Sequence, residues 1–268
     1  MVQAVVTGAA GRMGRAIISA IEKTPLITLS GAIESEDSPF INKDAGEVAG
    51  VGKLGVRITD SLERALKKAE VVIDFSNPEA SMKNLEDASA QKKAVVIGTT
   101  GFSHSQRDRI KEIAPLTRVV MAPNMSVGVN LLLKLVADAA RVMGKDYDIE
   151  IVECHHRHKK DAPSGTAIRI AEVAAHALNR DLDDVVVYER KGIIGERRPD
   201  EIGIQSVRAG DIVGDHTVIF AGPGERIEIT HRASSRETFA QGAVKAALWV
   251  MNKPDGIYDM QDVLGLKD

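Results

Sequence analysis

The sequence predicts an α/β protein with two domains: a Rossmann-like, parallel-sheet dinucleotide-binding domain and an α+β substrate domain with a mixed sheet. Apolar runs of strand length alternate with helix-like segments over the first 126 residues, and a glycine-rich turn follows the first run. From residue 127 this alternation gives way to one long apolar helix and then to closely spaced strands with short turns.

The first strand is expected at Val2–Thr7, and it leads directly into the turn Gly8-Ala9-Ala10-Gly11-Arg12-Met13-Gly14. A helix is expected next, because apolar residues recur at helical spacing between Met13 and Ile21. A strand, a glycine turn and a helix start together place backbone N–H groups and the positive end of the helix dipole where a pyrophosphate binds.

An acidic residue stands where a dinucleotide-binding unit places its ribose ligand. The second strand is expected at 27–34 and ends in Glu34, twenty residues after Gly14. The glycine spacing is G-x-x-G-x-x-G rather than G-x-G-x-x-G, and glycines also mark ordinary turns. Dinucleotide binding is therefore predicted from the agreement of strand, turn, helix and acid, and not from the glycines alone.

The alternation continues with strands expected at 69–75, 94–98 and 118–122 and with helices expected at 78–91 and 103–113. The second of these helices begins with a Ser-x-x-Gln capping box. In parallel sheets, ligands bind beyond the carboxyl ends of the strands, so the turns after these strands are expected to meet in one crevice. These turns, which would otherwise be plain connectors, are 76–78, 98–101 and 123–126.

The second half is expected to form a separate domain over residues 127–235, while residues 1–126 and 236–268 form the dinucleotide-binding domain. Turns at 209–211 and 222–224 predict antiparallel hairpins, because strand-like runs flank both of them. The other expected elements are helices at 127–143, 164–178 and 237–251 and strands at 148–154, 185–188, 202–207, 212–221 and 226–229.

Composition restricts the protein class. The 268 residues carry a formal charge of −3, and a single cysteine excludes an internal disulfide and fits a reducing cytoplasm. Apolar runs stay below the roughly 18 residues that a membrane span needs. The glycine- and arginine-interrupted start does not read as a signal peptide. We therefore expect a cytoplasmic protein without a membrane partner.

The segment Glu153–Thr166 is the most informative part of the chain. It contains three histidines, three lysines or arginines and a Ser-Gly-Thr turn within fourteen residues. Histidine titrates near neutral pH, and backbone N–H groups at a helix start suit a carboxylate or a phosphate. The segment therefore predicts proton transfer beside a small anionic ligand.

Three other interpretations of this segment remain open. A charged run is often only a solvated face, and a basic run can bind nucleic acid. Nucleic acid is disfavoured by the negative net charge and by a total of only nine Phe, Trp and Tyr residues. A metal site would need Cys154, His156 and His158 on one strand face, but Lys159 and Lys160 would repel a cation. We expect neither a nucleic-acid partner nor a metal.

With these segments in view, the chain resembles the 4-hydroxy-tetrahydrodipicolinate reductase (dihydrodipicolinate reductase) family over essentially its full length. The most specific resemblance lies in the runs His155-His156-Arg157-His158-Lys159 and Asp161-Ala162-Pro163-Ser164-Gly165-Thr166. The other matching segments are 8–14, 44–47, 98–101 and 124–130.

The resemblance implies hydride transfer from NADH or NADPH to a small cyclic unsaturated dicarboxylate in the diaminopimelate route to lysine. It implies that His155 transfers a proton, that Lys159 donates one, and that His156 contacts the substrate. Gly165 and Thr166 would hold a substrate carboxylate, and the family usually forms a homotetramer through the sheet of the substrate domain. The implied cofactor-binding residues are Gly8, Ala9, Ala10, Gly11, Arg12, Met13, Glu34, Ser35, Gly98, Thr99, Thr100, Ala122, Pro123, Asn124 and Met125.

One departure from the family bears on the choice of cofactor. Members that use NADPH well often have an arginine directly after the ribose-binding acid, whereas this chain has Ser35, followed by Glu36 and Asp37. NADH is therefore the expected preference, with Arg12 or Lys43 as partial compensation for the missing cation.

Two alternative functions remain open from the sequence. Another dehydrogenase of the same architecture is one, because a fold does not fix a function. A non-enzymatic dinucleotide sensor is the other, and it would not require an acid–base cluster beside an anion site.

Overall fold

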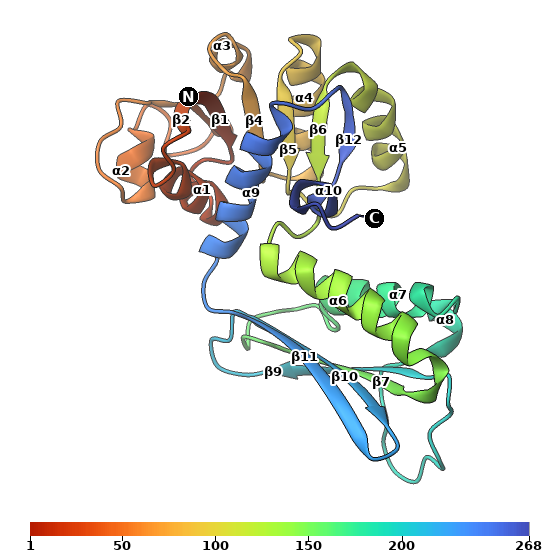
Figure 1. Cartoon of the computed structure of the whole chain (residues 1–268). Helices are drawn as coiled ribbons and strands as arrows, with labels where there is room; N and C mark the ends of the chain where they lie inside the picture. The colour runs from red at the N-terminus through yellow and green to blue at the C-terminus, as the bar shows by residue number, and fades with distance from the viewer. Residues whose placement is uncertain (268) are drawn as a thin grey trace. The chain divides into compact units, whose positions relative to one another are not determined.

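The computed structural model describes residues 1–267, which divide into two compact units. The first unit contains residues 1–127 and those from 236 onward, and the second is Gly128–Ser235. Figure 1 shows the elements of both units, and each unit is described by itself below.

The first unit is built on a seven-stranded sheet in which every pairing is parallel. The chain runs outward on one side of β1 and then returns to lay the next strands on its other side, so the order of strands reverses between β1 and β4. Such a reversal marks the ligand-binding edge of an open α/β sheet. In spatial order the strands are β12 (Gly256–Tyr258), β6 (Arg118–Met121), β5 (Ala94–Ile97), β4 (Val71–Asp74), β1 (Val2–Thr7), β2 (Ile27–Ile33) and β3 (Ile58–Thr59).

Helices cover both faces of this sheet, and two apolar cores result (Figure 1). The central strands are buried on both sides, which is why Val71, Val72 and Ile73 form an unbroken apolar run. One face carries α1 (Arg12–Glu22), α2 (Ala45–Ala49), α9 (Glu237–Val250) and α10 (Met260–Leu264). The other carries α3 (Leu62–Leu66), α4 (Pro78–Ala90), α5 (His104–Ile113) and the short 3₁₀ helix η1 (Ala114–Leu116).

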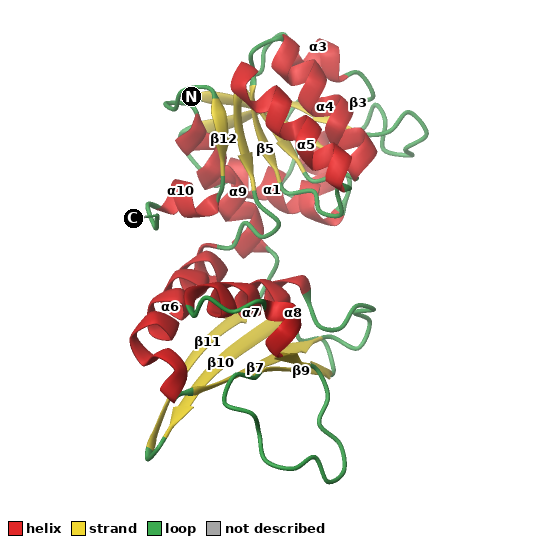
Figure 2. Ribbon diagram, turned by 90° about the vertical axis from the view of Figure 1, so that its right-hand side faces the viewer, coloured by secondary structure: helices red, strands yellow, loops and turns green. Residues whose placement is uncertain are grey.

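The second unit is a five-stranded mixed sheet with helices on one face (Figure 2). Side chains of β7 alternate between buried and partly exposed, as expected for a sheet with one covered face. The strands, in spatial order, are β11 (Glu225–Ala233), β10 (Gly214–Gly222), β7 (Asp148–His155), β9 (Ile202–Arg208) and β8 (Val186–Val187). The helices are α6 (Val127–Met143), η2 (Gly144–Asp146), α7 (Gly165–Ala177) and α8 (Leu182–Val185).

One expected hairpin is wrong. The turn at 209–211 does not join neighbouring strands, because β7 lies between β9 and β10 and pairs with both, parallel to β9 and antiparallel to β10. The turn crosses the end of β7, where Ala209 N–H donates to the His155 carbonyl and Arg157 N–H donates to the Gly210 carbonyl. The other expected hairpin, between β10 and β11, is confirmed.

Candidate active site

The glycine turn after β1 is shaped by close backbone contacts. Gly8 has a positive φ of 62°, which disfavours residues with a side chain. A Cβ on Gly14 would lie 2.1 Å from the Gly8 carbonyl oxygen, so the first turn of α1 packs against the loop only without a side chain there. This closeness leaves the loop backbone and the start of α1 adjacent, as a pyrophosphate site requires.

Glu34 is placed beside this turn. Its Oε1 accepts a hydrogen bond of 2.7 Å from the backbone N–H of Ala10. The contact fixes the carboxylate at the end of β2, where it has remaining lone pairs to accept hydrogen bonds from ribose hydroxyls. A cavity of about 1130 Å³ lies here, and among its lining residues are Gly8, Gly11, Glu34, Ser35, Ser76 and Asn77. The cavity and its polar lining fit the adenosine end of a dinucleotide.

Two of the three expected crevice turns meet at Asp74, which is fully buried at the end of β4. Asp74 Oδ1 accepts hydrogen bonds from the Ser76 hydroxyl at 2.6 Å and from the Thr99 hydroxyl at 3.3 Å. The Ser76 N–H also donates to Thr99 Oγ1 at 3.0 Å. Gly98 is required by packing, since a Cβ there would lie 2.1 Å from the Phe75 ring. Thr100 is exposed.

The third of these turns, residues 123–126, follows β6 and is held by contacts other than those at Asp74. The Ala122 N–H donates to the Ile97 carbonyl, and Asn124 accepts from the Ser126 N–H at 2.9 Å. Met125 is buried, and its carbonyl lies so close to α9 that a Cβ on Gly242 would be 1.8 Å from it. Pro123 is exposed.

Arg12 and Lys43 were expected to compensate partly for the missing arginine after Glu34, but neither lines the cavity beside Glu34. Arg12 is exposed, and Lys43 Nζ lies 4.8 Å from the centre of the Phe40 ring. Two other cations do line the cavity, Arg64 and Lys83. Sequence reasoning missed both, because neither belongs to the glycine turn or to the segment that follows Glu34.

In the second unit, His155 is the last residue of β7 and is buried on the face that the helices cover. Its Nδ1 lies 2.5 Å from Oε2 of Glu153, two residues earlier on the same face. Arg208, from β9, binds both oxygens of Glu153, with two N–O distances of 2.8 Å. The imidazole therefore sits on a buried carboxylate that a guanidinium neutralises.

The residues after β7 form a turn rather than a continued strand. Lys159 Nζ contacts both carboxylate oxygens of Asp161, at 2.9 and 2.8 Å, and this pair holds the ammonium group of Lys159 in place. His156 is half-buried and its ring centre is 6.2 Å from that of His158. A metal site would have needed Cys154, His156 and His158 on one strand face. Because β7 ends at His155, these three residues do not share such a face. Among residues 1–267, no group of three potential ligands could hold a metal ion.

A helix start completes the cluster. Ser164 caps α7: its hydroxyl accepts from the Ala167 N–H at 3.2 Å, and its own N–H donates to Glu153 Oε1 at 3.1 Å. A Cβ on Gly165 would meet no atom within 4 Å, so the space in front of the first turn is open. Thr166 lies in the same turn. The N–H groups of a first helical turn have no partner within the helix and suit an anion.

The electrostatics of the cluster follow from burial and from its ion pairs. Burial raises the pKa of Glu153, but hydrogen bonds from Arg208 and His155 outweigh it and bring the pKa to about 2. Burial lowers the pKa of His155, and the Glu153 carboxylate opposes this shift. Burial lowers the pKa of His216 to about 4, so His216 is neutral at neutral pH. His216 Nε2 lies 3.0 Å from the Ser164 hydroxyl.

Sequence reasoning assigned no role to Glu153, Asp161 or Ser164, although all three lie in the basic segment. The period of two along β7 could have indicated that Glu153 and His155 share a face. Arg208 and His216 gave no local signal, because they reach the cluster from strands more than fifty residues away.

Comparisons with known proteins point to one family over nearly the whole chain. The family model for the N-terminus of dihydrodipicolinate reductase matches residues 2–125, and the model for its C-terminus matches residues 128–264. The 4-hydroxy-tetrahydrodipicolinate reductase of Anaeromyxobacter dehalogenans (strain 2CP-1 / ATCC BAA-258) is 55% identical, over 100% of this chain and 99% of its own. The enzyme of the same name from Syntrophotalea carbinolica is 54% identical, over 100% of both chains.

Solved structures support the fold. A dipicolinate-bound dihydrodipicolinate reductase from Paenisporosarcina sp. TG-14 superposes with a TM-score of 0.79 at 23% identity, over 98% of this chain and 99% of that one. An amine dehydrogenase from Mycobacterium smegmatis gives a TM-score of 0.60 at 14% identity, over 96% and 94%. Both likenesses extend to the fold alone. Because both family models match and full-length relatives share more than half of its residues, the chain belongs to the dihydrodipicolinate reductase family.

Proposed function

We propose that this chain reduces 4-hydroxy-tetrahydrodipicolinate to tetrahydrodipicolinate in the diaminopimelate route to lysine, with NADH preferred over NADPH. The main support for this proposal is the cluster of acid–base groups at the end of β7, in a chain that belongs to this family. There, His155, the Lys159–Asp161 pair and the start of α7 are linked through hydrogen bonds to Glu153 and Arg208. We also propose a cytoplasmic location, because a single cysteine fits a reducing compartment. The described part of the chain has no helix of membrane-spanning length and hydropathy.

The proposed reaction assigns a task to each group. The 4-hydroxyl group and a proton from the neighbouring ring carbon leave together as water, which gives a conjugated imine. A bound dinucleotide would supply a hydride to this imine, and one proton from the protein or from solvent then completes the reduced ring. His155 and Lys159 stabilise the negative charge that develops on the ring and deliver that proton. Gly165 and Thr166 hold one substrate carboxylate at the start of α7, and His156 contacts the substrate.

The proposed dinucleotide site lies in the first unit. The backbone of Gly8 to Met13 faces the pyrophosphate, Glu34 and Ser35 face the adenosine ribose, and the segments 98–100 and 122–125 contact the nicotinamide end. The support is the glycine packing at Gly14 and the Glu34 carboxylate held by the Ala10 N–H.

A coupled assay tests the proposed function. The product of dihydrodipicolinate synthase is generated in the cuvette, and the loss of NADH absorbance is followed after this protein is added. Turnover that requires both the synthase product and NADH is expected. NADH binding without oxidation would instead support the dinucleotide sensor, and oxidation with an amino acid or amine alone would support another dehydrogenase.

We also propose that the protein assembles as a homotetramer through the face of the second sheet that the helices leave open. Val152 and Ile219 project from this face, and Val207 on it is 41% exposed. Light scattering on the purified chain measures the assembly directly, and a monomeric mass would overturn this part of the proposal.

A planar dicarboxylate is expected to compete with the substrate. Pyridine-2,6-dicarboxylate should inhibit much more strongly than pyridine-2-carboxylate, because a second carboxylate adds charge-assisted hydrogen bonds in the basic cluster. Gly165→Val should weaken dicarboxylate inhibition by about tenfold, ~1.4 kcal/mol, because its side chain enters the open space before α7. The affinity of the Gly165→Val variant for NADH and its melting temperature should equal those of the wild type. Equal inhibition by both compounds would contradict a two-carboxylate site.

NADH is expected to exceed NADPH in kcat/KM by about tenfold, ~1.4 kcal/mol. A 2′-phosphate would bring negative charge next to Glu34, and Ser35 offers no compensating cation. Arg64 and Lys83 line the same cavity, but so do Asp60, Glu63 and Asp87.

Two variants test this preference. Ser35→Arg should narrow the gap chiefly by lowering the KM for NADPH, while Ser35→Ala, which adds no cation, should leave the ratio unchanged. Equal or better use of NADPH by the wild-type protein would show that another cation reaches the phosphate. Arg64→Ala and Arg12→Ala would then identify that cation.

A further inference from the structure

Glu153 is a fully buried carboxylate, and the surrounding chain uses both of its oxygens. Oε2 faces His155 Nδ1 at 2.5 Å and accepts from Arg208 Nη1, while Oε1 accepts from Arg208 Nη2 and from the Ser164 N–H. A buried charge is tolerated when it is paired and its lone pairs are satisfied, and here both conditions hold. The carboxylate is ionised at neutral pH, because its pKa is about 2.

This arrangement determines which nitrogen of His155 carries the proton. An ionised carboxylate can only accept hydrogen bonds, so the Nδ1 that faces Glu153 must be protonated. In the neutral ring, Nε2 is then the nitrogen with a free lone pair. A Cβ on Gly214 would lie 3.0 Å from Nε2, so the glycine at this position leaves room beside that atom.

We propose that Glu153 is the positioning residue of the proton-transfer step. It holds His155 in the Nδ1–H form, so that Nε2 takes up and releases the proton, and it stabilises the imidazolium that exists while Nε2 is protonated. This inference rests on the proposed role of His155. When Nε2 gives its proton to the substrate, the ring returns to the neutral Nδ1–H form without any movement of the proton between His155 and Glu153.

The charges around His155 show why the carboxylate is needed. Arg208 from β9 and Lys159 from the turn are cations that disfavour an imidazolium, and burial disfavours it further. His216 from β10 presents its ring edge-on at 5.2 Å between centroids. Glu153 is the group that opposes these effects. A protonated His155 therefore depends on Glu153.

The same carboxylate also aligns the rest of the cluster. Arg208, which it binds, donates through Nη2 to the Asp161 carbonyl at 2.6 Å, and the Asp161 carboxylate holds Lys159. Through Ser164, Glu153 is joined to the start of α7. One buried ion pair thus connects both proposed proton-transfer residues to the proposed carboxylate-binding turn.

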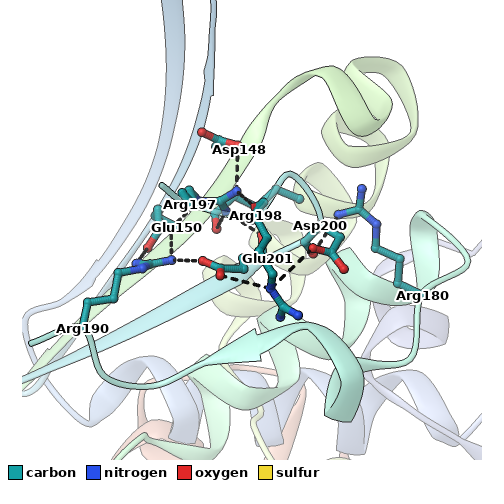
Figure 3. Close-up of polar contacts among 9 residues, drawn as sticks. Asp148, Glu150, Arg180, Arg190, Arg197, Arg198, Asp200 and Glu201 are labelled. Atoms are coloured by element: carbon teal, nitrogen blue, oxygen red, sulfur yellow. Dashed lines mark hydrogen bonds and ion pairs between the residues drawn. The ribbon is translucent and has the colours of Figure 1, made fainter. Parts of the chain in front are cut away.

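The test is Glu153→Gln in the full-length enzyme, with Glu150→Gln as the matched control. Glu150 lies on the same strand and is also bound by both terminal nitrogens of an arginine, Arg190, at 2.8 Å (Figure 3). It projects from the opposite face of β7, away from His155. Both variants remove one carboxylate charge from a carboxylate–arginine pair, but only Glu153→Gln removes the partner of the imidazole.

Three measurements separate a positioning role from a merely structural one. Glu153→Gln should lower kcat by roughly 10²-fold while the KM for NADH stays within about twofold, and the apparent pKa in the kcat/KM profile should fall. Nitrogen-15 NMR of histidine-labelled protein at mildly alkaline pH should show the Nδ1–H form of His155 in the wild type and in Glu150→Gln. In Glu153→Gln the Nε2–H form should gain population.

The outcomes distinguish this inference from the proposed function. If the wild type turns over and His155→Ala does not, but Glu153→Gln keeps a near-normal kcat and pH profile, the positioning role is wrong while the function stands. If the wild type itself fails to oxidise NADH with the substrate, the proposed function is wrong, and the NMR measurement still tests the tautomer. An Nε2–H form of His155 in the wild type overturns the inference even if Glu153→Gln does not fold.

Discussion

His155→Ala and Lys159→Ala are each expected to lower kcat by roughly 10²-fold or more, ~2.7 kcal/mol of transition-state stabilisation. The physical reason is that a hydride adds negative charge to the substrate ring, and these two groups are the proposed source of the proton and of the stabilising positive charge. His155 rests on Glu153 and Lys159 on Asp161, so both side chains are held in position before substrate binds. Such preorganisation is what makes a charged group effective in catalysis.

The chain offers close controls for both variants. His158 and Lys160 lie in the same turn, carry the same side chains and are exposed. His158→Ala and Lys160→Ala should therefore change kcat by less than about threefold, since an exposed side chain interacts only weakly with the rest of the cluster. Initial rates with saturating NADH and isothermal titration of NADH into each variant make the comparison. Near-normal turnover in both His155→Ala and Lys159→Ala would remove these residues from the chemical step.

The parallel sheet of the first unit could be predicted from the sequence because its strands are buried on both faces. Each central strand then contains a short apolar run, such as residues 71–73 of β4, and each turn at a strand's carboxyl end is marked by small residues. Several of the short elements were not predicted, including α2 and β3, because they are too short to show a period. α2 is instead set by Asp44, whose carboxylate accepts from four backbone N–H groups.

The order of strands in the second unit could not be predicted from local sequence. The turn after β9 has the composition of a hairpin turn, but β7 has two free edges and takes both β9 and β10. Pairing partners are decided by the packing of the whole sheet, which no short window contains. The same limit applies to the site. The basic segment indicated proton transfer, whereas the buried carboxylate–arginine pair that organises it becomes visible only when Arg208 is brought beside Glu153.

Acid should destabilise the fold through His216, in a defined pH window. Burial lowers the pKa of His216 to about 4 from an ordinary value of 6.5. Between pH 6.5 and 4, His216 is therefore protonated in the unfolded chain but neutral in the folded protein. Its contribution to the free energy of unfolding is fully present above pH 6.5 and is lost as the pH falls towards 4. The fall of the pKa from 6.5 to about 4 limits this loss to about 3 kcal/mol.

His216→Gln should remove most of this pH dependence while keeping a polar partner for the Ser164 hydroxyl. The burial of His155 and His231 lowers their pKa values too, so they contribute in the same window, and Glu153 and Lys159 also act on His216. The decisive quantity is therefore the slope of the unfolding free energy against pH, measured by urea denaturation between pH 7 and 4.5 in both proteins. His176→Gln, at an exposed position on α7, is the matched control and should keep the wild-type slope. A His216→Gln slope equal to that of the wild type would mean that His216 takes up a proton in the folded protein as readily as in the unfolded chain. Its ring would then face the Ser164 hydroxyl as a cation, and burial would not be the force that governs its charge.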